Sequence, residues 1–156
     1  MIEVGEQIPE FSLPSTQCET LSKADLKGSW AILYFYPKDN TPGCTTQTTD
    51  FTDLNAEFEK LECKIVGWNH NPMKSHDKFT EKLGIPFPLV SDESGKSLED
   101  FGVWQLKKFM GKEFMGIVRT TFLVNPDGEV VKRYDKVRVK EHAQKVLEDL
   151  KELQAN

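Results

Sequence analysis

Hydrophobic positions along the chain fall either in short continuous runs or at helical spacing. Residues 30–36 form a continuous apolar and aromatic run that stops at Pro37, a pattern typical of a strand buried on both faces. After this run, apolar residues recur three or four positions apart, which predicts a long helix: Phe51, Leu54, Phe58 and Leu61. The pattern therefore predicts a core strand followed directly by an amphipathic helix.

The rest of the chain continues this alternation of strands and helices. Further strands are predicted at residues 63–68, 87–90, 117–124 and 129–134, and further helices at residues 74–83, 97–101 and 140–153. Two short extended pieces, at residues 11–13 and 19–21, predict an N-terminal β-hairpin. The segment at residues 104–115 is interpreted as an apolar wall between elements. The order predicts an α/β fold of the thioredoxin-like type, a central mixed β-sheet flanked by helices.

Length and composition are those of an ordinary globular protein. The 156 residues fit one domain, so we predict a single domain over residues 1–156. A net charge of −5 argues against nucleic acid as a partner. The longest apolar run, residues 31–36, is too short to cross a membrane, so no membrane partner is expected. Residues 1–11 lack the features of a signal peptide, and the expected compartment is the cytoplasm.

The chain contains three cysteines, Cys18, Cys44 and Cys63, an odd and low number for its length. A disulfide scaffold is therefore not expected, and each thiol is either an inert core residue or a reactive group. The three histidines have no short metal-ligand spacing with the cysteines, so no metal site is predicted: His70, His76 and His142.

Cys44 occupies a position that favours reactivity. If Thr41 is the N-cap of the long helix and Pro42 its first residue, Cys44 lies at the third helical position. The unpaired N–H groups and the positive end of the helix dipole favour a thiolate there, and the thiolate is the nucleophilic form of cysteine. The alternative is a small buried helix residue without chemistry.

Arg119 is the second unusual residue, because it stands in an otherwise apolar predicted strand. A buried guanidinium without a partner is very costly, so Arg119 is expected to face an anion. That anion is either a carboxylate, in a structural role, or the thiolate of Cys44, whose charge a neighbouring cation would stabilise.

The spacing of Pro37, Thr41 and Cys44, with the distant Arg119, resembles the active-site signature of the peroxiredoxins. Residues 34–46 are similar to the branch known as bacterioferritin comigratory protein or peroxiredoxin Q. The similarity continues along nearly the whole chain, through residues 75–79, 86–89, 101–104, 116–122 and 142–143.

This resemblance implies a thiol-dependent peroxidase that reduces hydrogen peroxide and organic hydroperoxides. Cys44 is implied as the thiolate that attacks a peroxide oxygen and becomes a sulfenic acid. No cofactor is expected, because sulfur carries both electrons. The alternative is a peroxide sensor or a holdase on a thioredoxin fold, without significant turnover.

The other site residues have implied roles around Cys44. Thr41 would accept a hydrogen bond from the peroxide, and Arg119 with the N–H of Gly43 would stabilise charge as the O–O bond lengthens. Pro37 would shield the pocket from water. Gln47 takes a position that is often Glu in this branch, so its role is support and not proton transfer. Trp104 is a candidate wall for alkyl hydroperoxides, with ordinary packing as the alternative.

The sequence departs from the pattern of this branch at the resolving cysteine, the second thiol that forms a disulfide with the oxidised first one. Many members of the branch have a second cysteine five residues after the first, and this chain has Thr49 there. Cys63 and Cys18 are the remaining candidates, but a whole helix separates Cys63 from Cys44. An external thiol is therefore the expected reductant: thioredoxin, glutaredoxin or a small thiol. A monomer is expected rather than a dimer.

Overall fold

A five-stranded mixed sheet forms the centre of the computed structural model, which describes residues 1–155. Its strands lie in the order β5-β4-β3-β8-β9. Strands β3, β4 and β5 are parallel, and β8 and β9 are antiparallel to their neighbours. The bounds are β3 (Trp30–Phe35), β4 (Cys63–Asn69), β5 (Leu89–Ser91), β8 (Thr120–Val124) and β9 (Val130–Tyr134). The predicted thioredoxin-like α/β fold with a mixed sheet is confirmed.

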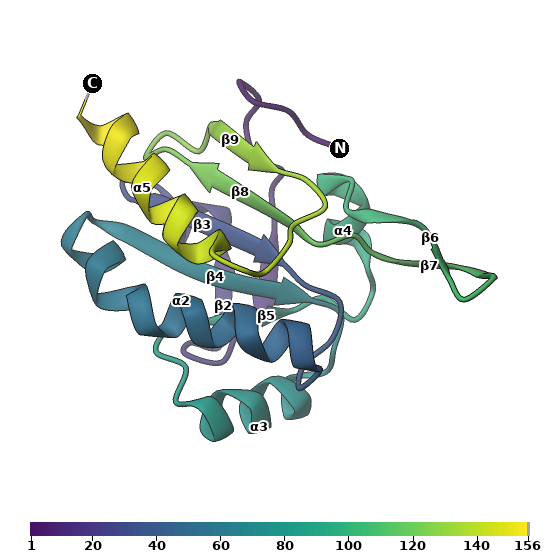
Figure 1. The fold of residues 1–156 in the computed structure, drawn as a ribbon. Coiled ribbons are helices and arrows are strands. Elements are labelled where there is room, and N and C mark those ends of the chain that lie inside the picture. The colour runs from purple at the N-terminus through teal and green to yellow at the C-terminus, as the bar shows by residue number, and fades with distance from the viewer. Residues whose placement is uncertain (156) are drawn as a thin grey trace.

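Helices and short strands cover both faces of this sheet (Figure 1). Helices α2 (Pro42–Lys60) and α5 (His142–Gln154) lie together on one face, with α3 (Met73–Leu83) beside α2. The other face carries α4 (Lys96–Phe101) and the N-terminal hairpin of β1 (Ser12–Pro14) and β2 (Thr20–Ser22), followed by the single turn α1 (Lys23–Leu26). The predicted N-terminal β-hairpin is therefore confirmed, although α1 was not expected.

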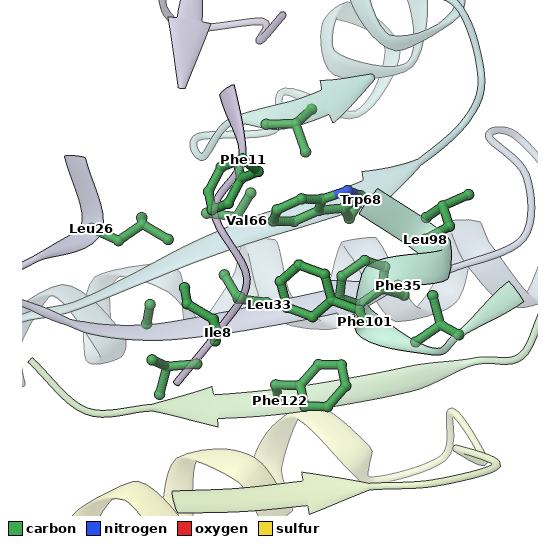
Figure 2. Close-up of a cluster of buried hydrophobic side chains, with 14 of the residues drawn as sticks. Ile8, Phe11, Leu26, Leu33, Phe35, Val66, Trp68, Leu98, Phe101 and Phe122 are labelled. Carbon is green, nitrogen blue, oxygen red and sulfur yellow. The ribbon is translucent and has the colours of Figure 1, made fainter. Parts of the chain in front are cut away.

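Alternate side chains of β3 divide the core into two clusters. Leu33 and Phe35 point to the face covered by the N-terminal segment and α4, where Trp68, Phe101 and Phe122 pack around them (Figure 2). On the opposite face, a second cluster packs beneath α2 and α5 and contains Ile32, Tyr34, Tyr36, Phe51, Phe58 and Leu147. Because both faces of β3 are buried, its continuous apolar run is explained.

The register of the sheet determines which loops meet at its edge. Phe35, at the carboxyl end of β3, pairs with Thr120, the first residue of β8. Trp30, at the opposite end of β3, pairs with Cys63. The segment after β3, which leads to Cys44, therefore meets the segment before β8, which contains Arg119.

The sequence-based prediction was wrong for residues 104–117. This segment forms a second antiparallel hairpin, β6 (Trp104–Phe109) and β7 (Lys112–Ile117), which extends away from the central sheet (Figure 1). Met110 and Gly111 join the strands with positive φ angles of 51° and 79°, the backbone that a tight hairpin turn requires. The predicted strand 117–124 is split, since β7 ends at Ile117 and β8 begins at Thr120.

Smaller differences concern the ends of elements. The last helix begins at His142 and not at residue 140, because Glu141 adopts a left-handed backbone with φ of 61°. Strand β5 begins at Leu89, two residues later than predicted, after Pro86-Phe87-Pro88. Among residues 1–155, no helix is long and apolar enough to cross a membrane.

Candidate active site

Cys44 lies in the first turn of α2, as the sequence predicts. Thr41 is the N-cap, with extended backbone, and Pro42 is the first helical residue, which places Cys44 third. The helix closes through the hydrogen bond that Thr45 N donates to Thr41 O at 2.8 Å. Cys44 is 1% exposed. Its sulfur is therefore held beside the unpaired N–H groups of the helix end, where negative charge is stabilised.

Arg119 connects the helix end to the sheet. Its Nη2 donates to Cys44 Sγ at 3.3 Å, and its Nη1 donates to Gln47 Oε1. Of the two partners that the sequence allowed for Arg119, the structure thus places the thiol and not a carboxylate beside it. Arg119 lies at the junction between β7 and β8 and not inside a strand, which corrects its predicted setting.

Gly43 and Gln47 allow and orient this contact. A Cβ atom at Gly43 would lie 3.3 Å from Arg119 Nη2, so a side chain there would crowd the guanidinium. Gln47 follows Cys44 by one helical turn and is 1% exposed. Since its Oε1 accepts from Nη1, the guanidinium plane is fixed with Nη2 toward the sulfur. Gln47 is neutral, so Arg119 keeps its full positive charge for the thiolate.

Thr41 and Pro37 define the loop before the helix. Thr41 Oγ1 donates to Lys38 O at 2.9 Å, which leaves the lone pairs of this hydroxyl free to accept another hydrogen bond. Pro37 follows directly after β3 and Tyr36 and has no N–H to donate. The loop therefore presents an acceptor at Thr41 next to the donors around Cys44.

Lys107 is a site residue that the sequence did not indicate. It lies on β6, and its Nζ donates to Ile117 O at 2.8 Å, two residues before Arg119. Burial and the neighbouring Arg119 lower the pKa of Lys107, while Cys44 acts in the opposite direction, so the ammonium shares the electrostatic field of the site. The sequence does not predict this position of Lys107, because residues 104–115 have no recognisable strand pattern. The position depends on the hairpin of β6 and β7, in which Lys107 pairs with Phe114.

Three of the predicted residues do not meet Cys44. Cys63 lies at the opposite end of the sheet, and burial raises its pKa to about 12, so it stays a thiol. Cys18 is exposed in the turn before β2. The Trp104 ring packs edge-on against His70, with ring centres 5.3 Å apart, and borders the apolar core. These contacts give Trp104 a packing role.

His142 is a buried group close to the site that changes the pH dependence of stability. Burial, and after it the charge of Arg119, lowers the pKa of His142 from 6.5 to about 4, although Asp149 opposes the shift. Its Nε2 is paired with Thr121 Oγ1 at 2.9 Å. The histidine is therefore neutral in the folded protein at neutral pH.

We expect His142 to make the protein less stable as the pH falls from 6.5 to 4. In this window the unfolded chain binds a proton at His142 and the folded protein does not, so acid favours unfolding. Between these pH values, the free energy of unfolding is expected to fall by on the order of 3 kcal/mol more in the wild type than in His142→Asn. Urea unfolding at several pH values measures this difference. Asp39 and Asp149, whose pKa values are lowered from 3.8, act mainly below this window. Parallel pH curves for the two proteins would contradict the assignment.

The arrangement around Cys44 narrows the class of protein. A thiol beside a helix N-terminus and a guanidinium is suited to attack a peroxide oxygen and to stabilise the departing one. On a thioredoxin-like fold, this defines a thiol-dependent peroxidase. The sequence profile of the AhpC/TSA family matches residues 4–133, and the chain belongs to that family.

Individual relatives agree with this assignment. The peroxiredoxin Bcp of Bacillus subtilis is 44% identical over 152 residues, which cover 97% of each chain. A solved structure of the bacterioferritin comigratory protein of Xanthomonas campestris, studied for its alkyl peroxide reduction activity, matches with a TM-score of 0.86, 42% identity and 90% coverage of each chain. A mutant of PrxQ from Xylella fastidiosa has a TM-score of 0.93 and 34% identity, covering 100% of this chain and 99% of its own. The protein is thus a peroxiredoxin enzyme.

Proposed function

We propose that Cys44 is the residue that reacts with peroxide, and that an external thiol completes the cycle. The observation that carries this proposal is the 3.3 Å contact from Arg119 Nη2 to Cys44 Sγ in the first turn of α2. Within residues 1–155, neither Cys63, a buried thiol of raised pKa, nor the exposed Cys18 accepts a hydrogen bond from a cationic side chain.

The first half-reaction follows from this geometry. The Cys44 thiolate attacks the terminal oxygen of the hydroperoxide, an S–O bond forms and the O–O bond breaks. Sulfur loses two electrons and becomes a sulfenic acid, while the leaving oxygen takes up a proton as an alcohol or water. Arg119 and the N–H groups of Gly43 and Cys44 stabilise the developing charge, and Thr41 accepts from the peroxide O–H. Pro37, which has no N–H, limits the access of water.

The second half-reaction needs a thiol from outside the chain. Thr49 stands where a resolving cysteine would follow Cys44 along α2. Cys63 pairs with the first residue of β3, whereas Cys44 lies beyond its last residue. Five residues of strand span about 17 Å, and a disulfide needs Cα atoms within about 7 Å. The external thiol forms a mixed disulfide with Cys44 and releases water, and a second thiol restores the Cys44 thiol and leaves as a disulfide.

The reductant and the setting follow from the same features. We assign the second half-reaction to thioredoxin, glutaredoxin or a small thiol. All three cysteines are free, which suits a reducing compartment such as the cytoplasm. We also propose a monomer of one domain, because Cys44, Arg119 and Gln47 meet within one chain. Sedimentation velocity measures that state directly.

Peroxide titration with thiol mapping tests the proposed cycle. Reduced protein treated with one equivalent of peroxide is expected to carry a sulfenic acid on Cys44, detected by dimedone labelling and mass spectrometry. With dithiothreitol present, peroxide consumption should continue well beyond one equivalent. A panel of thioredoxin, glutaredoxin and glutathione then identifies the reductant. A dominant Cys44–Cys63 or Cys18–Cys44 disulfide would overturn the external-thiol cycle, and a stop after one equivalent would indicate a sensor.

A further inference from the structure

The loop between β3 and α2 contains a carboxylate that the reaction does not use. Asp39 is 6% exposed, although it lies between Lys38 and Asn40, which are both exposed. Its Oδ1 accepts from the Tyr36 hydroxyl at 2.7 Å and from Asn69 Nδ2 at 3.3 Å. Its Oδ2 accepts from the Ser75 hydroxyl at 2.7 Å. Asp39 therefore connects the loop to the ends of β3 and β4 and to α3.

His76 completes the set of partners of Asp39. His76 Nδ1 lies 2.6 Å from Asp39 Oδ2, and its Nε2 lies 2.9 Å from Val90 O. The backbone carbonyl of Val90 only accepts, so Nε2 donates to it, while Nδ1 is hydrogen-bonded to Asp39 Oδ2. Burial alone would raise the pKa of Asp39, but the hydrogen bonds from His76, Tyr36 and Ser75 lower it. The two residues form a hydrogen-bonded pair in which the Asp39 carboxylate is stabilised.

This pair is almost completely removed from water. The side chains of His76 and Asp39 are 0% and 2% exposed. A buried carboxylate is stable only when its oxygens are hydrogen-bonded, and removing one of its partners leaves its charge poorly compensated. The pair therefore has two favourable states. In one, Asp39 and His76 are in contact, and in the other they are separated and hydrated.

The loop transmits this constraint to the reactive thiol. Asp39 N donates to Asn71 Oδ1 at 2.8 Å, which fixes the backbone on the other side of the carboxylate. The adjacent Lys38 provides the carbonyl that accepts from Thr41 Oγ1. Thr41 is the N-cap of the helix that holds Cys44. The position of Asp39 thus determines where the Thr41 hydroxyl and the first turn of α2 lie.

We propose that Asp39 and His76 are positioning residues for the peroxide step, and that separation of this pair opens Cys44 to its reductant. This inference rests on the proposed role of Cys44. Peroxide is small and requires the closed loop, in which donors and acceptors surround the sulfur. A thiol is larger and must approach a sulfur that is 1% exposed, so the loop has to move for the second half-reaction. The two half-reactions therefore depend on the Asp39–His76 pair in opposite ways.

Separate measurement of the two half-reactions tests this proposal. Asp39→Asn and His76→Gln are expected to lower the rate constant for sulfenic acid formation at Cys44 by about tenfold or more, as a displaced catalytic group does. The rate constant for reduction of the sulfenic acid by glutathione should increase, and an unchanged value would refute the opening of Cys44 by separation of the pair. The double variant should be no slower than the worse single variant, because the two residues act as one pair.

Ser75→Ala is the matched control, since it removes one hydrogen bond to Asp39 Oδ2 and leaves the contact between Asp39 and His76 in place. We expect a smaller loss in the peroxide step, about two- to threefold, with faster hydrogen exchange at residues 38–44 and unchanged exchange in α5. This milder variant keeps the proposal testable if the charge variants fold poorly.

The outcomes separate this inference from the proposed function. If the wild type forms no sulfenic acid at Cys44, the proposed function fails first. If Cys44 is oxidised normally but the variants react with peroxide as fast as the wild type, the positioning role is refuted. An equal loss in both half-reactions would also overturn it, because that result indicates only a smaller folded fraction.

Discussion

Cys44→Ser is expected to abolish peroxide reduction, with a decrease of the second-order rate constant on the order of 10³ or more. A hydroxyl stays protonated at neutral pH and is a far weaker nucleophile toward oxygen than a thiolate. The substitution is nearly isosteric at a residue that is 1% exposed, so the fold should be retained. Stopped-flow measurement of peroxide loss with excess dithiothreitol gives the rate constant.

The other two cysteines provide the controls for this experiment. Cys18→Ser and Cys63→Ala should keep rate constants within about twofold of the wild type, since neither residue contacts the site. Cys63→Ala is expected to lower stability because it truncates a core side chain, and circular dichroism should accompany the assay. Substantial turnover by Cys44→Ser would refute the assigned nucleophile. Loss of turnover in Cys63→Ala with the fold intact would give Cys63 a role in the cycle.

The central elements could be predicted because their patterns are strong. Residues 30–36 form a continuous apolar run because both faces of β3 are buried, and the helix after it begins at the expected Thr41-Pro42 boundary. Residues 125–128, Asn-Pro-Asp-Gly, have the composition of a tight turn, and the strands on either side of them, β8 and β9, pair antiparallel. In each case a local pattern reports directly on the burial or turn geometry that decides the structure.

The hairpin of β6 and β7 could not be predicted, because its side chains do not carry a burial pattern. Leu106, Phe109, Met110, Phe114 and Met115 are all exposed, and lysines lie between them. Strand alternation is visible in a sequence only when one face is buried. For the same reason, the sequence predicts Arg119 inside a strand, whereas the residue lies between the end of β7 and the start of β8.

The site could be predicted only in part, because its residues come together through tertiary register. The family resemblance and the helix start indicated Cys44, Thr41 and Arg119. The pairing of Phe35 with Thr120 then brings Arg119 to the helix, which no local pattern contains. The contact of Asp39 with His76 joins residues 37 positions apart in the sequence and depends on the packing of α3. Lys107 likewise reaches the site through the hairpin.

Arg119→Met is expected to lower the rate constant for the peroxide step by about 10²–10³-fold, the usual effect of removing one donor that stabilises a departing oxygen. Methionine retains much of the length and the apolar stem of arginine but removes both the charge and the donors. The loss should appear in sulfenic acid formation under single-turnover conditions. Reduction by the external thiol should change much less, because the hydroxyl of the sulfenic acid takes up the proton of the incoming thiol and leaves as water, so that less negative charge develops on the departing oxygen.

Two further variants separate the charge of Arg119 from its geometry. Arg119→Lys keeps a cation but lacks the planar fork, so one ammonium must replace contacts that two guanidinium nitrogens make to Gln47 and Cys44. We expect it to recover only a small part of the rate that Arg119→Met loses. Arg138→Met, at an exposed arginine in the loop before α5, should react like the wild type and controls for the change in net charge. If Arg119→Lys were fully active, a single positive charge at residue 119 would suffice, and the two directed contacts of the guanidinium to Gln47 and Cys44 would not be required.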